Sequence, residues 1–470
     1  MTEVNVPSVA RELLQRLGPE LVVTGEDVLR YCHDWHGDVQ SSALAVLRPR
    51  NTPEVQECVR AAGALGLNIV PQGGNTGLVL GAVPDMPDHQ VVLTLERMTA
   101  IRQLDCDNFS AVVESGIVLE EFKAKVAEAG LFFPLTLGAQ GSCRLGGNVS
   151  TNAGGVNVLR YGMTRDLVLG LEVVLPDGSL FEGLSSLRKD NRGIDLKHLF
   201  IGSEGTIGII TAVSVKLLPA PDQVATALLA LESLEDAITL YRHARRQCCD
   251  LMSAFEFLPP LAFDLAKEGI PDLVLPMAAE HPAYVLMEIA GSGLVDMDDL
   301  MARFVEYAFE AGLVLDGVVA QSQAQARNLW LIREGMNEGQ AKRGKHLRTD
   351  LSVPLSRVAA FVAETEAAIL ADMPDVICVS YGHVGDGNVH LNVLPDLSGD
   401  IDAQICRAKQ IANRVLDGYH GSISAEHGIG RLKKGDFSER LPEVQRRLNV
   451  AIRKSVDPAM VMNKGCQIDL

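Results

Sequence analysis

The sequence lacks a concentrated run of basic residues. Its 42 Lys and Arg are outnumbered by 60 Asp and Glu, which gives a formal net charge of −18. A surface of that sign repels nucleic acid and anionic membranes. The chain also lacks an uninterrupted apolar stretch of the ~18 residues that a bilayer-spanning helix needs. These absences exclude a nucleic-acid-binding protein and predict that no segment spans a membrane.

A disulfide framework and a structural zinc cluster are absent as well. The nine cysteines are odd in number and scattered, and none forms a C-x-x-C pair. This arrangement fits neither a disulfide framework nor a structural zinc cluster. The N-terminal segment has an early glutamate and no apolar core of ~7–15 residues, so we expect no signal peptide. A reducing cytoplasm is the expected location.

A G-x-G-x-x-G motif after a strand is also missing, so the sequence predicts no Rossmann-type NAD site. Glycine is nevertheless abundant, at 43 of 470 residues, and it gathers in residues 73–81, 138–155 and 202–208. Glycine among small polar residues at strand ends lets backbone N–H groups surround a pyrophosphate. The alternative for any one segment is an ordinary tight turn, but three in one half of the chain favour a nucleotide cofactor.

Strands and helices alternate in the first half of the chain. Residues 51–54, Asn-Thr-Pro-Glu, are typical of a helix start, with Thr52 as the cap and Pro53 in the first turn. A short apolar strand over residues 68–71 leads directly into the first glycine segment. The pattern predicts a mixed structure of helices and strands.

A domain boundary is predicted at Pro219-Ala220-Pro221, where proline interrupts the pattern. Beyond it, segregated helices and strands indicate an antiparallel sheet. We expect an α+β protein with a nucleotide-binding domain over residues 1–219. A substrate domain should follow over residues 220–420, and a helical segment over 421–470 should pack back on the first domain.

Two histidines flank a strong hairpin signal in the stretch YGHVGDGNVHLN, residues 381–392. Asp386-Gly387 favours a two-residue turn, and counting outward from it pairs His383 with His390 across the strands, with Cβ atoms ~5 Å apart. Imidazoles that close suit a shared metal ion better than two repelling cations. The alternative is a pair of surface-loop histidines.

The later segment SAEHGIG, residues 424–430, offers the other groups that such a site needs. Glu426 can supply an oxygen ligand and His427 a base, which leaves an open position for substrate, as in catalytic zinc or manganese sites. Arg333 and Asn337 share one face of a predicted helix, and Arg348 follows. These side chains can bind a carboxylate, although a solvated helix face is the simpler explanation from the residues alone.

These motifs, together with PQGGNTGL, GGNVSTNAGG followed by RYG, and IGSEGTIGIIT, make the chain similar to the FAD-linked oxidases of the D-2-hydroxyglutarate and D-lactate dehydrogenase type. The resemblance runs from Leu44 to the C-terminus and implies a vanillyl-alcohol-oxidase (PCMH) type FAD domain. It implies noncovalent FAD, because no histidine occupies the first loop. The residues that it places around FAD are Pro71, Gly73, Gly74, Asn75, Thr76, Gly77, Gly138, Gly141, Ser142, Gly147, Asn148, Thr151, Asn152, Glu204, Gly205, Ile210 and Asn463.

The resemblance also implies roles for the second group of motifs. His383, His390 and Glu426 match the ligands of a divalent metal, zinc or alternatively manganese, and His427 matches the catalytic base. A carboxylate-binding set is implied as well, and its members are Arg333, Asn337, Arg348 and Asn392.

The implied reaction is oxidation of a D-2-hydroxy acid to the 2-oxo acid, with His427 taking the hydroxyl proton and a hydride passing to flavin N5. D-2-hydroxyglutarate is the expected substrate. D-lactate or another short acid such as glycolate is the alternative, and a non-catalytic flavin electron carrier is disfavoured because it has no use for the histidine hairpin. The expected electron acceptor is soluble, such as an electron-transfer flavoprotein, and a homodimer stays open.

The sequence departs from the family pattern at a few positions. Leu80 stands where a glycine is usual, and Lys464 where a proline commonly follows Asn463. Arg348 and Asn337 stand where the hydroxyglutarate enzymes usually have lysine and threonine. These two replacements keep the charge and the polarity of the positions, but they leave open how long the substrate is.

Overall fold

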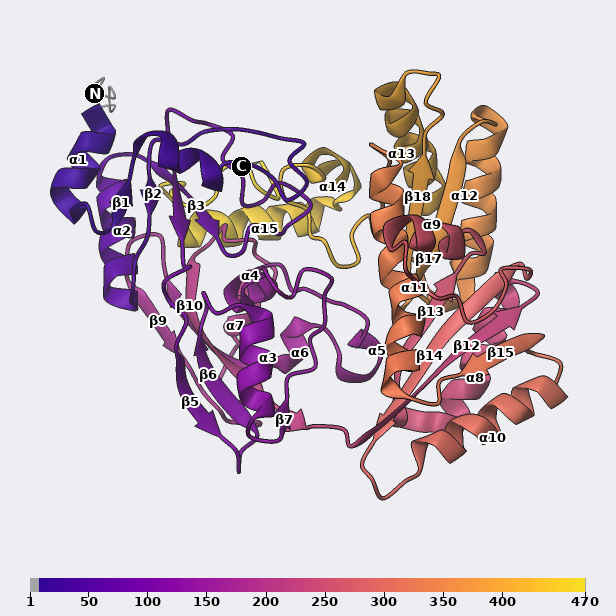
Figure 1. Cartoon of the computed structure of the whole chain (residues 1–470). Helices are drawn as coiled ribbons and strands as arrows, with labels where there is room; N and C mark the ends of the chain where they lie inside the picture. Colours follow the sequence, from indigo (N-terminus) through magenta and orange to yellow (C-terminus); the bar gives the residue numbers. More distant parts are fainter. Residues whose placement is uncertain (1–7, 470) are drawn as a thin grey trace. The chain divides into compact units, whose positions relative to one another are not determined.

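The computed structural model describes residues 8–469 (Figure 1). The early glutamate on which the signal-peptide expectation depends lies outside the described residues. The chain forms two compact units. The first comprises residues up to Gly154, Met163–Ala220 and the segment from Glu426, and the second comprises Gly155–Gly162 and Pro221–Ala425.

A four-stranded sheet occupies the N-terminal part of the first unit, in the order β1-β2-β4-β3. Both β2 and β3 run parallel to β4. Helices α1 and α2 pack against the sheet and share its apolar core. The elements are α1 (Ser8–Leu17), β1 (Val22–Val23), β2 (Val46–Leu47), α2 (Thr52–Ala64), β3 (Asn68–Gln72) and β4 (Gln90–Thr94).

The predicted start of α2 is correct to within one residue, but its cap is not Thr52. The Asn51 side chain caps the helix by accepting a hydrogen bond from the Glu54 backbone N–H at 3.0 Å. The Thr52 hydroxyl instead donates to Glu172 at 2.7 Å. Asn51 is extended and therefore suited to the capping position, whereas Thr52 is already helical.

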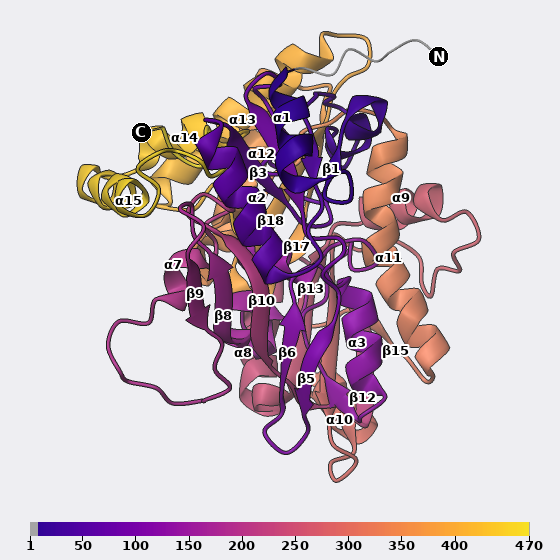
Figure 2. The same ribbon diagram turned by 90° about the vertical axis from the view of Figure 1, so that its left-hand side faces the viewer.

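A five-stranded antiparallel sheet forms the second layer of the first unit, in the order β5-β6-β10-β8-β9, and Figure 2 shows these strands side by side. Helices α3 and α4 and the two-stranded pair of β7 with β11 add to its core. The elements are β5 (Ile101–Asp105), β6 (Ser110–Glu114), α3 (Leu119–Ala127), β7 (Leu131–Phe132), α4 (Leu145–Ser150), α6 (Thr164–Leu167), β8 (Val168–Val174), β9 (Leu180–Gly183), α7 (Lys197–Phe200), β10 (Ile209–Lys216) and β11 (Leu218–Pro219).

The C-terminal segment returns to the first unit. Its helices are α14 (Lys434–Arg440) and α15 (Glu443–Val456). The Ile69 N–H donates to the Val461 carbonyl oxygen and the Asn463 N–H donates to the Ile69 carbonyl oxygen, both at 2.7 Å. These bonds fasten the chain end beside β3, the strand that leads into the first glycine segment.

The second unit is built on a seven-stranded sheet in the order β15-β12-β14-β13-β17-β18-β16. Every described pairing in it is antiparallel. Alternate residues of β12 face two separate cores, one under α8 and α10 and the other under α9 and α11. The elements are α5 (Val158–Tyr161), β12 (Gln223–Leu231), α8 (Leu234–Cys248), β13 (Met252–Leu258), α9 (Leu261–Gly269), β14 (Ala283–Gly291), α10 (Met297–Glu310), β15 (Asp316–Val319), α11 (Gln323–Lys342), β16 (Leu351–Ser352), α12 (Val358–Asp372), β17 (Ile377–His383), β18 (Asn388–Leu394) and α13 (Ile401–Gly418).

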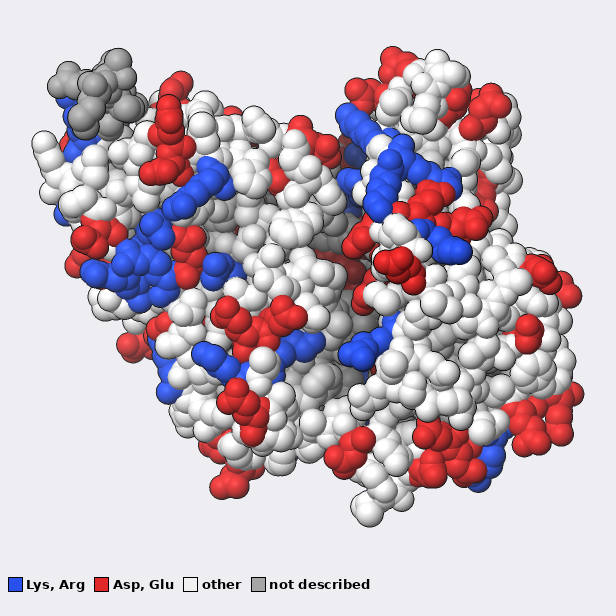
Figure 3. All heavy atoms as spheres, viewed as in Figure 1, with Lys and Arg blue, Asp and Glu red and all other residues white. Residues whose placement is uncertain are grey.

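The mixture of helices with largely antiparallel sheets confirms the predicted α+β class. Figure 3 shows acidic side chains in many separate groups over the visible face, with basic side chains gathered in a few groups among them. The whole chain has a net charge of −18. Among residues 8–469, no helix combines the length and the apolar composition that crossing a bilayer demands.

Candidate functional site

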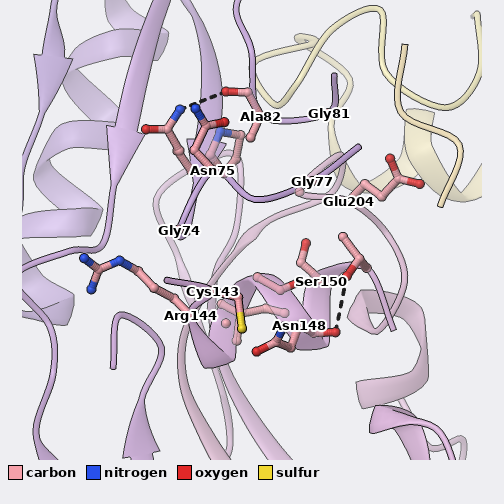
Figure 4. Close-up of a pocket in the computed structure, with 18 of the residues that line it drawn as sticks. Gly74, Asn75, Gly77, Gly81, Ala82, Cys143, Arg144, Asn148, Ser150 and Glu204 are labelled. Atoms are coloured by element: carbon pink, nitrogen blue, oxygen red, sulfur yellow. Dashed lines mark hydrogen bonds between the residues drawn. The ribbon is translucent and has the colours of Figure 1, made fainter. Parts of the chain in front are cut away.

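The glycine segments of the first unit meet around one pocket (Figure 4). Its empty space, including the part open to solvent, is about 920 Å³. The first glycine segment enters it from the end of β3, and the second enters through α4. The third enters between α7 and β10. Of the residues that the sequence placed around FAD, those that line the pocket are Pro71, Gly73, Gly74, Asn75, Thr76, Gly77, Gly147, Asn148, Thr151, Glu204, Gly205 and Ile210.

Backbone contacts between the loops explain why glycine is required. A Cβ atom on Gly74 would lie 2.1 Å from the Ser142 carbonyl oxygen and 2.9 Å from the Cys143 Cα. A Cβ atom on Gly146 would lie 2.5 Å from the Ser115 Cβ. Any side chain at these positions would push the loops apart, because distances that short are repulsive.

Two buried polar atoms in the pocket suit a bound nucleotide. Among the described residues, the Ser115 hydroxyl oxygen and the Asn148 amide oxygen have no hydrogen-bond partner. Buried polar groups are almost always paired, so such atoms point to a ligand that pairs with them. Eight glycines also line the pocket, and glycine backbone can offer N–H groups to phosphate oxygens. The pocket therefore fits FAD.

Glu204 connects the pocket to the segment that carries His427. Its carboxylate accepts hydrogen bonds from the backbone N–H groups of Ile429 at 2.8 Å and Gly430 at 2.7 Å. His427 lies on the pocket wall. Asn463 donates to the carbonyl oxygens of Gly81 and Glu204, so it connects the first and third glycine segments.

Several predicted cofactor residues do not line the pocket. The structure places Ser142 against Gly74. Asn463 is hydrogen-bonded to the carbonyl oxygens of Gly81 and Glu204. Other wall residues were not predicted, among them Ser115, Cys143 and Arg144. Ser115-Gly116 directly follows β6, and this strand-end glycine was the signal that could have identified Ser115. The predicted residues outside the lining are Gly138, Gly141, Ser142, Asn152 and Asn463.

Leu80, the departure from the family glycine, adopts φ of 61°. That is the left-handed region that favours glycine over residues with a Cβ atom.

In the second unit, the histidine hairpin forms with a different register from the one we predicted. His390 pairs directly with Tyr381, two residues before His383. The connection contains a 3₁₀ turn over Val384–Asp386, followed by Gly387 at φ 82°. A shift of two residues keeps the same face, so the rings of His383 and His390 still approach, with centroids 5.8 Å apart.

Hydrogen bonds at Nδ1 fix the orientation of both imidazoles. His383 Nδ1 lies 2.6 Å from Glu256 Oε1, and His390 Nδ1 lies 3.1 Å from the Thr349 carbonyl oxygen. Both partners are acceptors, so in a neutral ring Nδ1 would carry the proton and Nε2 would hold a lone pair. This arrangement is typical of metal-binding histidines. The donor set fits a divalent metal such as zinc.

Glu256 also accepts a hydrogen bond from Arg333 Nε, at 3.0 Å. Burial raises the pKa of this carboxyl, but His383 and Arg333 outweigh it and lower the pKa to about 2. The Arg333 guanidinium lies over the Tyr381 ring, 4.7 Å from its centroid. Sequence reasoning missed Glu256, although a single charged residue within the strand SAFEFL was a usable signal.

The predicted carboxylate-binding residues are connected through Tyr381. Its hydroxyl donates to Asn337 Oδ1 at 2.8 Å, and Asn392 Nδ2 lies 3.1 Å from the same hydroxyl. Burial raises the pKa of the Tyr381 phenol, while Arg333 and Arg348 oppose that shift. The structure thus brings Arg333, Asn337 and Asn392 into one network, with Arg348 exposed nearby.

The end of the second unit is fastened beside the hairpin by Asp350. This residue accepts hydrogen bonds from Asn388 Nδ2 at 2.9 Å, from the Ser424 hydroxyl at 3.1 Å and, through its carbonyl oxygen, from the Ala425 N–H at 3.2 Å. Glu426 is the next residue along the chain. It belongs to the first unit, where its carboxylate lies beside Gly154.

A fold of this type with a nucleotide pocket in the first unit defines an FAD-dependent oxidoreductase. Residues 43–183 match the FAD binding domain, and residues 220–466 match the family described as FAD linked oxidases, C-terminal domain. The chain belongs to this family of FAD-linked oxidases.

Full-length relatives extend the comparison. The chain is 38% identical to the D-2-hydroxyglutarate dehydrogenase, mitochondrial, of Bos taurus, over 96% of this chain and 81% of that protein. It is also 38% identical to the D-2-hydroxyglutarate dehydrogenase of Xanthomonas citri pv. viticola, over 96% and 95%. The solved structure of p-cresol methylhydroxylase with substrate bound matches with a TM-score of 0.75 at 16% identity, over 99% of this chain and 98% of that one. This confirms the predicted PCMH-type fold.

Proposed function

We propose that this FAD-dependent enzyme oxidises D-2-hydroxyglutarate to 2-oxoglutarate. The names of the relatives support this substrate. The observation that carries the proposal is the buried network in which Arg333 and the histidine hairpin share Glu256. A substrate with a carboxylate at each end needs a cation at a fixed distance from the group that binds its hydroxy-acid end. A guanidinium is well suited to bind that distal carboxylate.

We also propose that His383, His390 and Glu426 bind a divalent metal, zinc in our assignment and manganese as the alternative. The tautomers of the two histidines support this, as does the anchoring of Ala425, the residue before Glu426, to Asp350. A bound ion would act as a Lewis acid on the hydroxyl and carboxylate of the substrate. Chelator treatment is expected to abolish turnover, and addition of the ion to restore it.

The roles of the protein side chains follow from their chemistry. His427 takes the proton of the substrate hydroxyl, because an imidazole nitrogen that holds a lone pair can accept a proton. Arg333 and Arg348 bind the distal carboxylate, and Asn337 and Asn392 complete the polar wall through Tyr381. FAD supplies the hydride acceptor for the Cα hydrogen. The predicted pocket residues of the first unit hold the cofactor.

D-lactate, or another short acid such as glycolate, is the second candidate substrate. These acids lack a distal carboxylate. They are favoured if Arg348, which is exposed and makes no hydrogen bond to a described residue, plays no part in substrate binding. A non-catalytic flavin carrier would show the FAD spectrum without reduction by any hydroxy acid.

We further propose a soluble electron acceptor such as an electron-transfer flavoprotein. The cytoplasmic location and the homodimer stay predictions.

A panel of D-2-hydroxy acids assayed with an artificial electron-accepting dye tests the substrate. We expect the highest kcat/KM for D-2-hydroxyglutarate. Arg348→Ala should lower that value about tenfold or more, since one charged hydrogen bond contributes ~1.5–3 kcal/mol, and should leave D-lactate turnover nearly unchanged. Equal losses for both acids, or a wild-type preference for D-lactate, would favour the short substrate.

A further inference from the structure

Glu256 lies in the middle of the seven-stranded sheet, where a charged side chain is unusual. Its neighbours on β13 are Phe255 and Phe257, and the residue is fully buried. Its cross-strand partners are Leu286 on β14 and His383 on β17. Burying a carboxylate costs several kcal/mol unless it is paired and hydrogen-bonded. A residue kept there at such a cost must make interactions that a neutral side chain does not.

The two oxygens of Glu256 have different partners. Oε1 accepts from His383 Nδ1 at 2.6 Å, and Oε2 accepts from Arg333 Nε at 3.0 Å. Both partners are themselves buried, with 6% and 7% of their surface exposed. The carboxylate is therefore a bridge between a residue of the hairpin and a residue of α11, 50 positions apart in the chain.

We propose that Glu256 is a positioning residue, which holds the metal-binding imidazole of His383 and the carboxylate-binding guanidinium of Arg333 in one rigid frame. This inference rests on the proposed function. Accepting from Nδ1 keeps the Nε2 lone pair of His383 directed to the metal. Accepting from Nε anchors Arg333 through one nitrogen, so that its two terminal nitrogens remain for a substrate carboxylate. The frame sets the distance between the two ends of a diacid.

An amide at position 256 cannot replace the carboxylate, although it has nearly the same shape. Both neighbours donate a hydrogen, and Glu256→Gln offers one acceptor oxygen and one NH₂ donor. If the oxygen faces Arg333, the NH₂ group faces His383 Nδ1 and favours the tautomer with a proton on Nε2. If the oxygen faces His383, the NH₂ group faces the Nε–H of Arg333 and displaces the guanidinium.

The same sheet supplies a matched control in Glu288. This residue lies on β14 opposite Ala254, diagonal to Glu256. Its carboxylate also accepts two hydrogen bonds, from the Ser253 hydroxyl at 2.7 Å and from Trp330 Nε1 at 3.0 Å. Neither partner is a proposed metal or substrate residue. The effect of Glu288→Gln therefore measures the loss of a carboxylate from this sheet without loss of the frame.

The experiment uses the FAD-loaded full chain, stripped of metal with a chelator and titrated with Zn²⁺ in a calorimeter. We expect Glu256→Gln to weaken Zn²⁺ binding about 10–100-fold and Glu288→Gln to leave it within about threefold. Glu256→Asp keeps two acceptor oxygens and should recover part of the affinity. In the dye assay, Glu256→Gln should also raise KM for D-2-hydroxyglutarate more than KM for D-lactate.

Each outcome decides a separate point. Tight Zn²⁺ binding by wild type and equal binding by Glu256→Gln would overturn the positioning role and leave the proposed function standing. Equal losses in both glutamine variants, or an aspartate variant weaker than the glutamine variant, would also overturn it. If wild type binds no Zn²⁺ and turns over without it, the metal part of the proposed function fails, and this inference fails with it.

Discussion

The carboxylate of Glu204 accepts a hydrogen bond from the backbone N–H of Gly430 at 2.7 Å, across 226 positions of sequence. This bond and its companion to the Ile429 N–H hold the segment with His427 on the wall of the cofactor pocket. Glu204 itself adopts φ of 51°, so the third glycine segment is bent to present this carboxylate. The segment with the proposed base His427 and the cofactor pocket are thus joined by one side chain.

Glu204→Gln is expected to slow flavin reduction by substrate about tenfold or more. The amide keeps one acceptor and places a donor against a backbone N–H, and loss of one hydrogen bond to a charged group costs ~1.5–3 kcal/mol. The rate is measured by mixing the FAD-loaded variant with substrate under anaerobic conditions. Glu172→Gln is the control, because Glu172 bonds Thr52, Thr211 and Arg102 away from the pocket. Equal rates for the two variants would contradict this role of Glu204.

Gly74→Ala is expected to destabilise the apoprotein by about 1–3 kcal/mol and to weaken FAD binding, since the new Cβ would overlap the Ser142 carbonyl oxygen. The matched control is Gly138→Ala, where a Cβ meets nothing within 4 Å. That change should stay within about 0.5 kcal/mol. Urea unfolding and FAD titration of both variants provide the measurements. A stable Gly74→Ala variant with normal FAD affinity would show that the two loops can separate.

Glu288→Gln should change how stability depends on pH. Burial raises the pKa of the Glu288 carboxyl above its ordinary value, against the opposing hydrogen bonds of Ser253 and Trp330. The folded wild type then binds this proton more tightly than the unfolded chain does. The contribution of Glu288 to the free energy of unfolding therefore falls as pH rises from the unfolded pKa of ~4.3 through the raised folded value.

The variant lacks that titration. Its stability relative to wild type should rise with pH across this window and then level off towards neutral pH. Urea unfolding of both proteins at a series of pH values measures the difference. A difference that is constant with pH, or one that falls as pH rises, would show that the folded state does not raise this pKa.

Much of the first unit could be predicted because glycine requirements are local. Gly74 and Gly77 follow a strand, and both lie on the pocket wall. Ser115 and Arg144 were missed because their place on the wall depends on which strand ends meet in space. The α+β class followed from element order, which is also a local property.

The hairpin was predicted in part. Asp386-Gly387 marked the turn correctly. The connection also contains a 3₁₀ turn at Val384–Asp386, so it is longer than the predicted two residues, and His390 pairs with Tyr381 instead of His383. Side-chain alternation preserved the conclusion that His383 and His390 meet. Glu256 was missed because its partners come from β17 and α11. The single charge within the apolar strand β13 marked an unusual residue, but it could not indicate which distant residues contact it.

The most direct test of the central claim is anaerobic titration of the yellow protein with D-2-hydroxyglutarate, followed through the visible flavin band. We expect the D enantiomer to bleach wild type and the L enantiomer to leave it yellow. His427→Ala should bind FAD normally and be reduced about 10²–10⁴-fold more slowly. Failure of D-2-hydroxyglutarate to bleach wild type, or bleaching of His427→Ala at a rate near that of wild type, would contradict the account.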